Sequence, residues 1–220
     1  MTRAGATSRI RSRARVGPPS PTERHGARLA APALLALTLL AVLAARVADG
    51  AEGAASHVVV GSVVLVVAAL DVTVGWGLYV LLGDRARPSA HATLVSRSGY
   101  AVLLVAASAR LLWPGGDGLD GFRADWSMAL LVLGLHLVIA AVAGWRSRIA
   151  PPLVVAAVAL AGVASLLDHL VAPSDAATSG RALVPVLLGE VVLLGWLVGA
   201  SRGRRPAALR ARGVDSPGGA

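Results

Sequence analysis

The stretch "VVLVVAALDVTVGWGLYVLL", residues 63–82, is apolar almost throughout and carries one carboxylate, Asp71, near its middle. Twenty helical residues at ~1.5 Å each cover the ~30 Å hydrocarbon core of a bilayer, so the stretch predicts a membrane-spanning helix. An acid at the centre of such a helix costs about 2.5–3.5 kcal/mol on insertion scales. Such groups persist when they are paired, hydrated or used, which makes Asp71 the first candidate for a functional residue.

The composition of the whole chain agrees with a membrane protein. Of 220 residues, 55% are hydrophobic and 15% are charged, whereas about a quarter of the residues of a soluble domain are charged. The 21 basic residues are all arginine, and alanine, glycine and valine abound, a bias typical of a high-GC bacterial genome such as an actinobacterium's. The chain has no cysteine, which excludes disulfides, cysteine-ligated clusters and thiol nucleophiles.

Apolar runs recur along the chain and predict an all-α, polytopic membrane protein with six transmembrane helices. We expect these helices at residues 29–45, 58–82, 92–113, 126–145, 151–171 and 182–199, within a bundle that covers residues 29–201. Flexible basic tails are expected over residues 1–28 and 202–220. A cleaved secretory signal in place of the first helix is the open alternative, and it would leave five helices.

The distribution of charge predicts the orientation. Seventeen of the arginines fall on the side of the two termini, and four fall on the other side: Arg46, Arg110, Arg123 and Arg181. Seven acids lie on the arginine-poor side: Asp49, Glu52, Asp117, Asp120, Asp125, Asp168 and Asp175. Because arginine gathers in cytoplasmic loops, we expect both termini in the cytoplasm and a multi-pass protein of the bacterial cell (inner) membrane.

Aromatic residues are expected in belts at the two interfaces, where an apolar ring with one polar group is favoured. The expected outer belt is Trp113, Phe122 and Trp126, and the expected inner belt is Tyr79, Tyr100, Trp145 and Trp196, with Trp76 a little deeper.

Three polar residues are expected to share one layer inside the membrane. Counted at ~1.5 Å per residue from the inner helix ends, Asp71 lies about 16 Å deep, and His136 and Glu190 about 14 Å. Two acids and an imidazole at one depth predict a ligand or proton site. The competing interpretation is a structural ion pair between Asp71 and Arg97, because Arg97 starts one to two turns inside the third helix and its side chain is long.

Three segments together resemble the bacterial membrane proteins grouped as domain of unknown function 4386, over roughly residues 60–200. The resemblance rests on Asp71 followed by "LYVLL", on Arg97, on "GLHL" around His136, and on Glu190 followed by Trp196 and leucine. The turn after "RIAPP" departs from the family, because valines stand where it has glycines. The resemblance implies no established activity.

We therefore expect an integral membrane protein of unassigned biochemical function, whose polar layer stabilises the bundle and binds a small ligand or a proton. The first alternative is a proton-coupled small-solute transporter. The second is a membrane enzyme or a haem- or metal-binding protein, based on His57, His169 and the nearby Asp168. We expect no catalytic residues, metal or cofactor. Membrane lipids are the expected partners, nucleic acid is not expected, and a homo-oligomer and an unidentified small-molecule ligand are left open.

Overall fold

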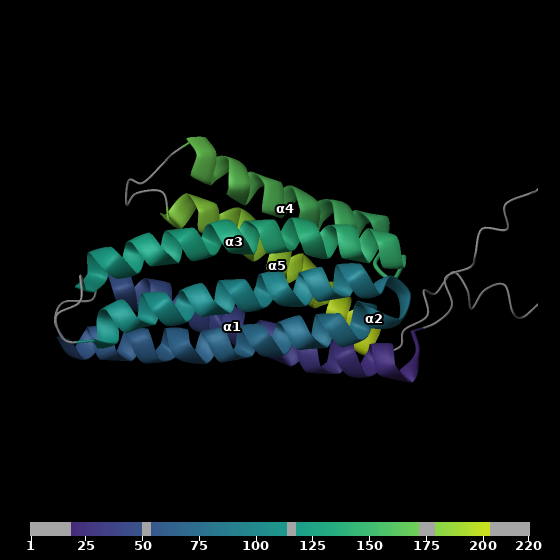
Figure 1. Cartoon of the computed structure of the whole chain (residues 1–220), viewed down its shortest axis with the longest axis horizontal. Coiled ribbons are helices and arrows are strands. Elements are labelled where there is room, and N and C mark those ends of the chain that lie inside the picture. The colour runs from purple at the N-terminus through teal and green to yellow at the C-terminus, as the bar shows by residue number, and fades with distance from the viewer. Residues whose placement is uncertain (1–18, 50–53, 114–117, 172–178, 203–220) are drawn as a thin grey trace, which may run out of the picture.

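The chain forms a bundle of long helices in the computed structural model, which describes residues 19–49, 54–113, 118–171 and 179–202 (Figure 1). These residues are helical except at a few turn positions, and they contain no strand. The five helices are α1 (Pro21–Asp49), α2 (Ala54–Leu112), α3 (Gly118–Ser147), α4 (Pro152–Val171) and α5 (Ser179–Ser201). Helix α2 packs against α1 and α3, α4 packs against α3 and α5, and α5 also packs against α1. The all-α prediction is confirmed.

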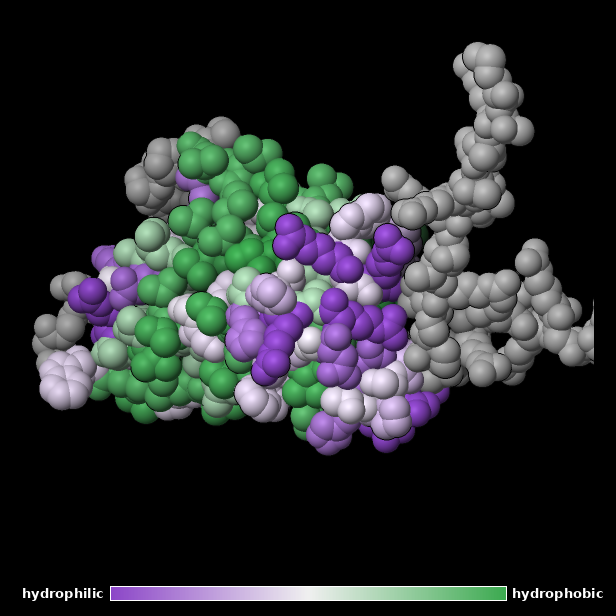
Figure 2. All heavy atoms as spheres, turned by 45° about the vertical axis from the view of Figure 1, so that its right-hand side comes forward, coloured by the Kyte–Doolittle hydropathy of each residue, from purple (hydrophilic) through white to green (hydrophobic). Residues whose placement is uncertain are grey.

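All five helices are long and apolar enough to cross a membrane. Apolar side chains also face outward: on α4, Leu153, Leu160 and Leu170 are 81%, 70% and 74% exposed. Figure 2 shows hydrophobic residues spread over the middle of the visible face, with hydrophilic residues toward its two ends. Water does not favour so large an exposed apolar surface, and lipid does. The structure therefore supports a multi-pass membrane protein that contacts lipid.

The second and third predicted helices belong to one element, α2, which folds back on itself (Figure 1). The predicted link at residues 83–91 is helical apart from Ala86, which has φ −149° and ψ 56°. Pro88 follows two residues later. Pro88 has no amide hydrogen to donate to the carbonyl group four residues earlier, so the helical hydrogen-bond pattern is interrupted at this bend. A bend of one residue replaces the expected loop.

The first helix starts earlier than expected. The prediction of a tail through residue 28 is wrong for residues 21–28, because these residues form the first two turns of α1. Ser20 and Glu23 cap the helix reciprocally: the Ser20 amide donates to Glu23 Oε2 at 2.6 Å, and the Glu23 amide donates to Ser20 Oγ at 3.1 Å. Pro21 is well suited to the first helical position. Helix α3 likewise begins at Gly118, eight residues before the predicted start. Residues 1–18 and 203–220 of the expected tails lie outside the described residues.

Arginines gather at one end of the bundle. The start of α1, the bend of α2, the turn between α3 and α4 and the end of α5 all lie at this end (Figure 1). Its described arginines are Arg24, Arg28, Arg85, Arg87, Arg146, Arg148 and Arg202. We call it the basic end. The described chain therefore enters and leaves the bundle at the same end.

Small residues allow the helices to approach closely. A Cβ atom on Gly26 of α1 would lie 2.6 Å from the carbonyl oxygen of Gly77 in α2. In the same way, a Cβ on Gly162 of α4 would lie 2.7 Å from the carbonyl oxygen of Gly134 in α3. Small residues at such crossings bring backbones together, which is the common mode of helix packing in membranes.

Candidate functional site: a buried carboxylate–guanidinium triad

Asp71 and Arg97 meet because α2 folds back. Asp71 lies 15 residues before Ala86 and Arg97 lies 11 residues after it, so their backbone depths differ by about 6 Å at ~1.5 Å per residue. The long arginine side chain covers that difference, and Arg97 Nε lies 2.5 Å from Asp71 Oδ1. Both side chains are 0% exposed. The absence of a side chain at Gly75 leaves room for the arginine, since a Cβ there would lie 3.1 Å from Arg97 Cβ.

Glu190 of α5 completes the cluster. Its Oε1 lies 2.8 Å from Arg97 Nη1, and its side chain is 3% exposed. On the far side of Glu190, Thr38 Oγ1 of α1 lies 3.5 Å from Oε2. Thr38 donates its hydroxyl proton at the shorter distance of 2.7 Å to the carbonyl oxygen of Leu34. One guanidinium thus joins α2 to α5, and α5 reaches α1. We call Asp71, Arg97 and Glu190 the triad.

The triad is not balanced in charge. Two carboxylates face one guanidinium, so the fully ionised triad carries one excess negative charge in a buried setting. Within the described residues, the two Asp71 oxygens and the three Arg97 side-chain nitrogens make no hydrogen bond of normal geometry besides these ion-pair contacts. An uncompensated charge in such a place is expensive. A proton on one carboxyl group would remove the excess charge.

The aromatic ring of Tyr100 lies beside the triad rather than at the membrane interface. Arg97 Cζ is 5.9 Å from the ring centroid, and Tyr100 is 3% exposed. This distance is within the range in which a cation is attracted to the face of an aromatic ring. The expectation that Tyr100 belongs to an interfacial belt is therefore wrong.

His136 lies next to the triad's helix but does not contact its acids. Its Nδ1 lies 3.0 Å from Ser96 Oγ, and the Ser96 hydroxyl is 3.1 Å from the carbonyl oxygen of Thr93. If Ser96 donates its only proton to Thr93, His136 Nδ1 carries a hydrogen and Nε2 is an acceptor. His136 is fully buried, and Nε2 has no hydrogen-bond partner among the described residues. The structure therefore brings Asp71 and Glu190 together through Arg97 and holds His136 through Ser96.

The histidines proposed for a metal or haem do not form a ligand cluster. His169 places Nδ1 2.9 Å from the carbonyl oxygen of Ser165 and Nε2 2.9 Å from that of Ser127. Both ring nitrogens therefore face backbone groups of α3 and α4. In the described part of the chain, no three histidine, aspartate or glutamate side chains are grouped so that they could hold a metal ion.

A second ion pair was not predicted from the sequence. At the basic end, Glu23 of α1 pairs with Arg85 at the bend of α2, with Arg85 Nε 2.6 Å from Oε1 and Nη2 3.2 Å from Oε2. The Glu23 side chain is 2% exposed. The motif Ser20-Pro21-Thr22-Glu23 is a helix-start signal that would have revealed Glu23 as a capping residue. The pairing of Glu23 with Arg85 could not be predicted in this way, because it depends on how α1 and α2 pack.

Comparisons with protein-family models, curated proteins and solved structures find no significant match to this chain. The candidate site therefore depends on the geometry described above.

Proposed function

We propose that the chain is an integral membrane protein that crosses the bilayer six times with its basic end in the cytoplasm. Two features support six crossings. Helix α2 has 59 residues, which would be about 88 Å long if straight, nearly three times the ~30 Å hydrocarbon core. It also folds back on itself, so each half is long enough for one crossing (Figure 1). The arginines at the basic end support the orientation. The resemblance to domain of unknown function 4386 remains part of this proposal.

Single cysteines test this topology cleanly, because the chain has none of its own. Arg87→Cys and Arg148→Cys place a thiol at the basic end, and Ala124→Cys places one at the other end. In intact cells, a membrane-impermeant maleimide should label only Ala124→Cys, and in inverted vesicles only the other two. Labelling of Arg87→Cys and Ala124→Cys from the same side would contradict six crossings.

The function that the geometry supports best is a protonatable structural lock. The observation that carries it is that two buried carboxylates share one guanidinium. We assign one exchangeable proton to the fully buried Asp71, which keeps the triad neutral while Arg97 ties α2 to α5. Thr38 Oγ1 donates to the carbonyl oxygen of Leu34 at 2.7 Å and lies 3.5 Å from Glu190 Oε2, so it gives the excess charge of the triad little compensation. Proton occupancy would then set how firmly the helices hold together.

The dependence of stability on pH tests this function. In the folded state at acidic pH the triad holds its proton and is neutral, so the stability is fully present. As the pH rises the proton is lost, the excess carboxylate is uncompensated, and the stability falls. Asp71→Asn removes the excess charge and should flatten this dependence, as should Glu190→Gln. The measurement is thermal unfolding of the purified protein in detergent from mildly acidic to mildly alkaline pH. A wild-type profile that Asp71→Asn leaves unchanged would refute the lock.

Proton-coupled transport of a small solute is the second candidate. His136 favours it, because its Nε2 is buried without a hydrogen-bond partner among the described residues and a proton relay needs a second buried acceptor. Reconstituted vesicles with a pH gradient and an internal pH dye provide the test. Proton flux that is lost in His136→Gln, with unfolding temperature unchanged, would favour transport over a static lock.

A further inference from the structure

A groove of about 600 Å³ opens at the basic end between the start of α1 and the bend of α2. Its volume lies within the ~300–1,000 Å³ of small-molecule sites, which is far more than a single ion requires. The groove is lined by Thr22, Tyr79, Val80, Gly83, Asp84, Arg85 and Arg87. It is separate from the triad, which lies deeper in the bundle.

The groove presents one charge of each sign that has no partner. Arg85 is neutralised by Glu23, at 2.6 and 3.2 Å. Asp84 and Arg87 are both exposed, and neither side chain makes an ion pair or a hydrogen bond among the described residues. They flank Ala86, where the helical geometry is interrupted. A purely anionic ligand would be repelled by Asp84, and a purely cationic one by Arg87.

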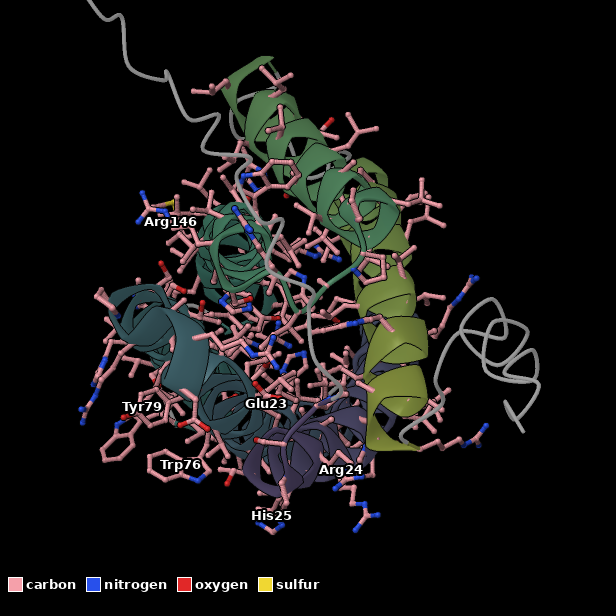
Figure 3. All side chains as sticks on the ribbon, turned by 90° about the vertical axis from the view of Figure 1, so that its right-hand side faces the viewer. Glu23, Arg24, His25, Trp76, Tyr79 and Arg146 are labelled. Carbon is pink, nitrogen blue, oxygen red and sulfur yellow. The ribbon has the colours of Figure 1, made fainter. Side chains whose placement is uncertain are left out.

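Aromatic rings form one side of this region. Tyr79 contacts the Trp76 ring at a centroid distance of 5.4 Å and the His91 ring, edge to face, at 4.9 Å. Figure 3 shows Trp76 and Tyr79 projecting outward from α2, whereas Glu23 lies where α1 meets α2. Tryptophan and tyrosine at the end of a membrane helix mark the headgroup level, and their rings attract cations.

An apolar track leads from the groove toward the membrane interior. Val72 and Trp76 are 46% and 52% exposed on the face of α2 that continues to Val80, at a spacing of four residues. Residues at this spacing share one helix face. A molecule with a polar head in the groove could therefore lay a hydrocarbon chain along Val72 and Trp76.

We infer that this groove binds the headgroup of an amine-bearing zwitterionic phospholipid. Arg87 and the Tyr79 and Thr22 hydroxyls hold the phosphate, because arginine and hydroxyl groups donate to phosphate oxygens. Asp84 accepts hydrogen bonds from the primary ammonium group, which also lies near the Tyr79 ring. The headgroup thus provides a partner for each of the two unpartnered charges, and the acyl chain of the lipid follows the apolar track.

Native mass spectrometry of the detergent-solubilised full chain tests this site with three lipids of the same acyl chains: phosphatidylethanolamine, phosphatidylcholine and phosphatidylglycerol. We expect phosphatidylethanolamine to bind most tightly. Choline cannot donate a hydrogen bond to Asp84, and phosphatidylglycerol has no cation for it. Arg87→Gln and Asp84→Asn should each weaken phosphatidylethanolamine binding about tenfold, the cost of one lost charged hydrogen bond. Arg146→Gln is the matched control, because Arg146 is exposed at the same end but projects from α3 (Figure 3).

Three outcomes would overturn the inference. Equal affinity for the three lipids would show that the site does not distinguish between headgroups. Tightest binding of phosphatidylglycerol would show that the site prefers an anionic headgroup to a zwitterionic one. Binding of soluble phosphoethanolamine as tight as that of the lipid would identify a soluble ligand instead. Asp84 and Arg87 are exposed, so both variants should keep the wild-type unfolding temperature in the absence of added lipid. A loss of lipid binding can therefore be distinguished from a loss of stability caused by the triad.

Discussion

Removing the guanidinium of Arg97 should be far more damaging than removing either carboxylate of the triad. Arg97→Gln leaves Asp71 and Glu190 buried together with no cation beside them. Breaking a buried ion pair by deleting one partner costs about 3–5 kcal/mol. Here two acids lose their partner, so we expect the upper end of that range. Asp71→Asn instead leaves a balanced Arg97–Glu190 pair and removes one charged contact, for which about 1–2 kcal/mol is the expected loss.

The same charge count predicts a rescue. Neutralising all three positions in Arg97→Gln/Asp71→Asn/Glu190→Gln removes every buried charge, and polar groups without charge are far less costly to bury. The triple variant should therefore unfold at a higher temperature than Arg97→Gln alone. Arg123→Gln is the surface control, because Arg123 is 46% exposed, its partner Asp120 is 94% exposed and the pair is 3.6 Å apart. Its expected cost is about 0–0.5 kcal/mol.

Thermal unfolding in detergent measures this series, with folded yield by size-exclusion chromatography as a second measure for any variant that expresses poorly. An Arg97→Gln variant that is as stable as Arg123→Gln would refute a structural role for the triad. Equal losses in Asp71→Asn and Arg97→Gln would show that a simple neutral pair, rather than an unbalanced triad, explains the site. A triple variant less stable than Arg97→Gln would refute the charge argument directly.

Two further predictions concern the contact between α1 and α2. Glu23→Gln weakens both the helix cap and the ion pair to Arg85, and should lower the free energy of unfolding by about 1–2 kcal/mol. His25 is exposed on the same turn, so His25→Gln should change the free energy of unfolding little. Equal losses in the two variants would contradict a specific role for Glu23. Gly26→Val forces a side chain into the backbone of α2 and should cost about 1–3 kcal/mol. A Cβ atom at Gly99 would meet no atom within 4 Å, so Gly99→Val should cost less than 1 kcal/mol, and similar unfolding temperatures for the two glycine variants would refute the close approach of α1 and α2.

The sequence predicts the helices well because each depends on its own apolar run. It predicts their ends less well. The polar start of α1 resembles a tail by composition, and only the reciprocal cap of Ser20 and Glu23, together with packing against α2, holds it in a helix. Gly83, Asp84 and Arg85 likewise indicate a loop by composition, yet the helix continues to a single irregular residue, Ala86.

The candidate site was predicted in part, for a physical reason. Depth can be counted along a helix, which places Asp71 and Glu190 in one layer, and the length of an arginine side chain makes Arg97 a natural partner. How each helix is rotated and which helices are neighbours depend on packing of the whole bundle. For that reason the sharing of one guanidinium by two acids, and the attachment of His136 to Ser96, could not be read from spacing.

The single-residue bend at Ala86 has a consequence for how the protein enters the membrane. Only 25 residues separate Asp71 from Arg97 along the chain, and almost all of them are helical, so both halves of α2 emerge from the ribosome in quick succession. If the two halves enter the membrane together as a hairpin, the Asp71 carboxylate already has Arg97 as its counterion. Neither group then enters the lipid without its partner, and Glu190, the last of the three to be synthesised, joins an ion pair that has already formed.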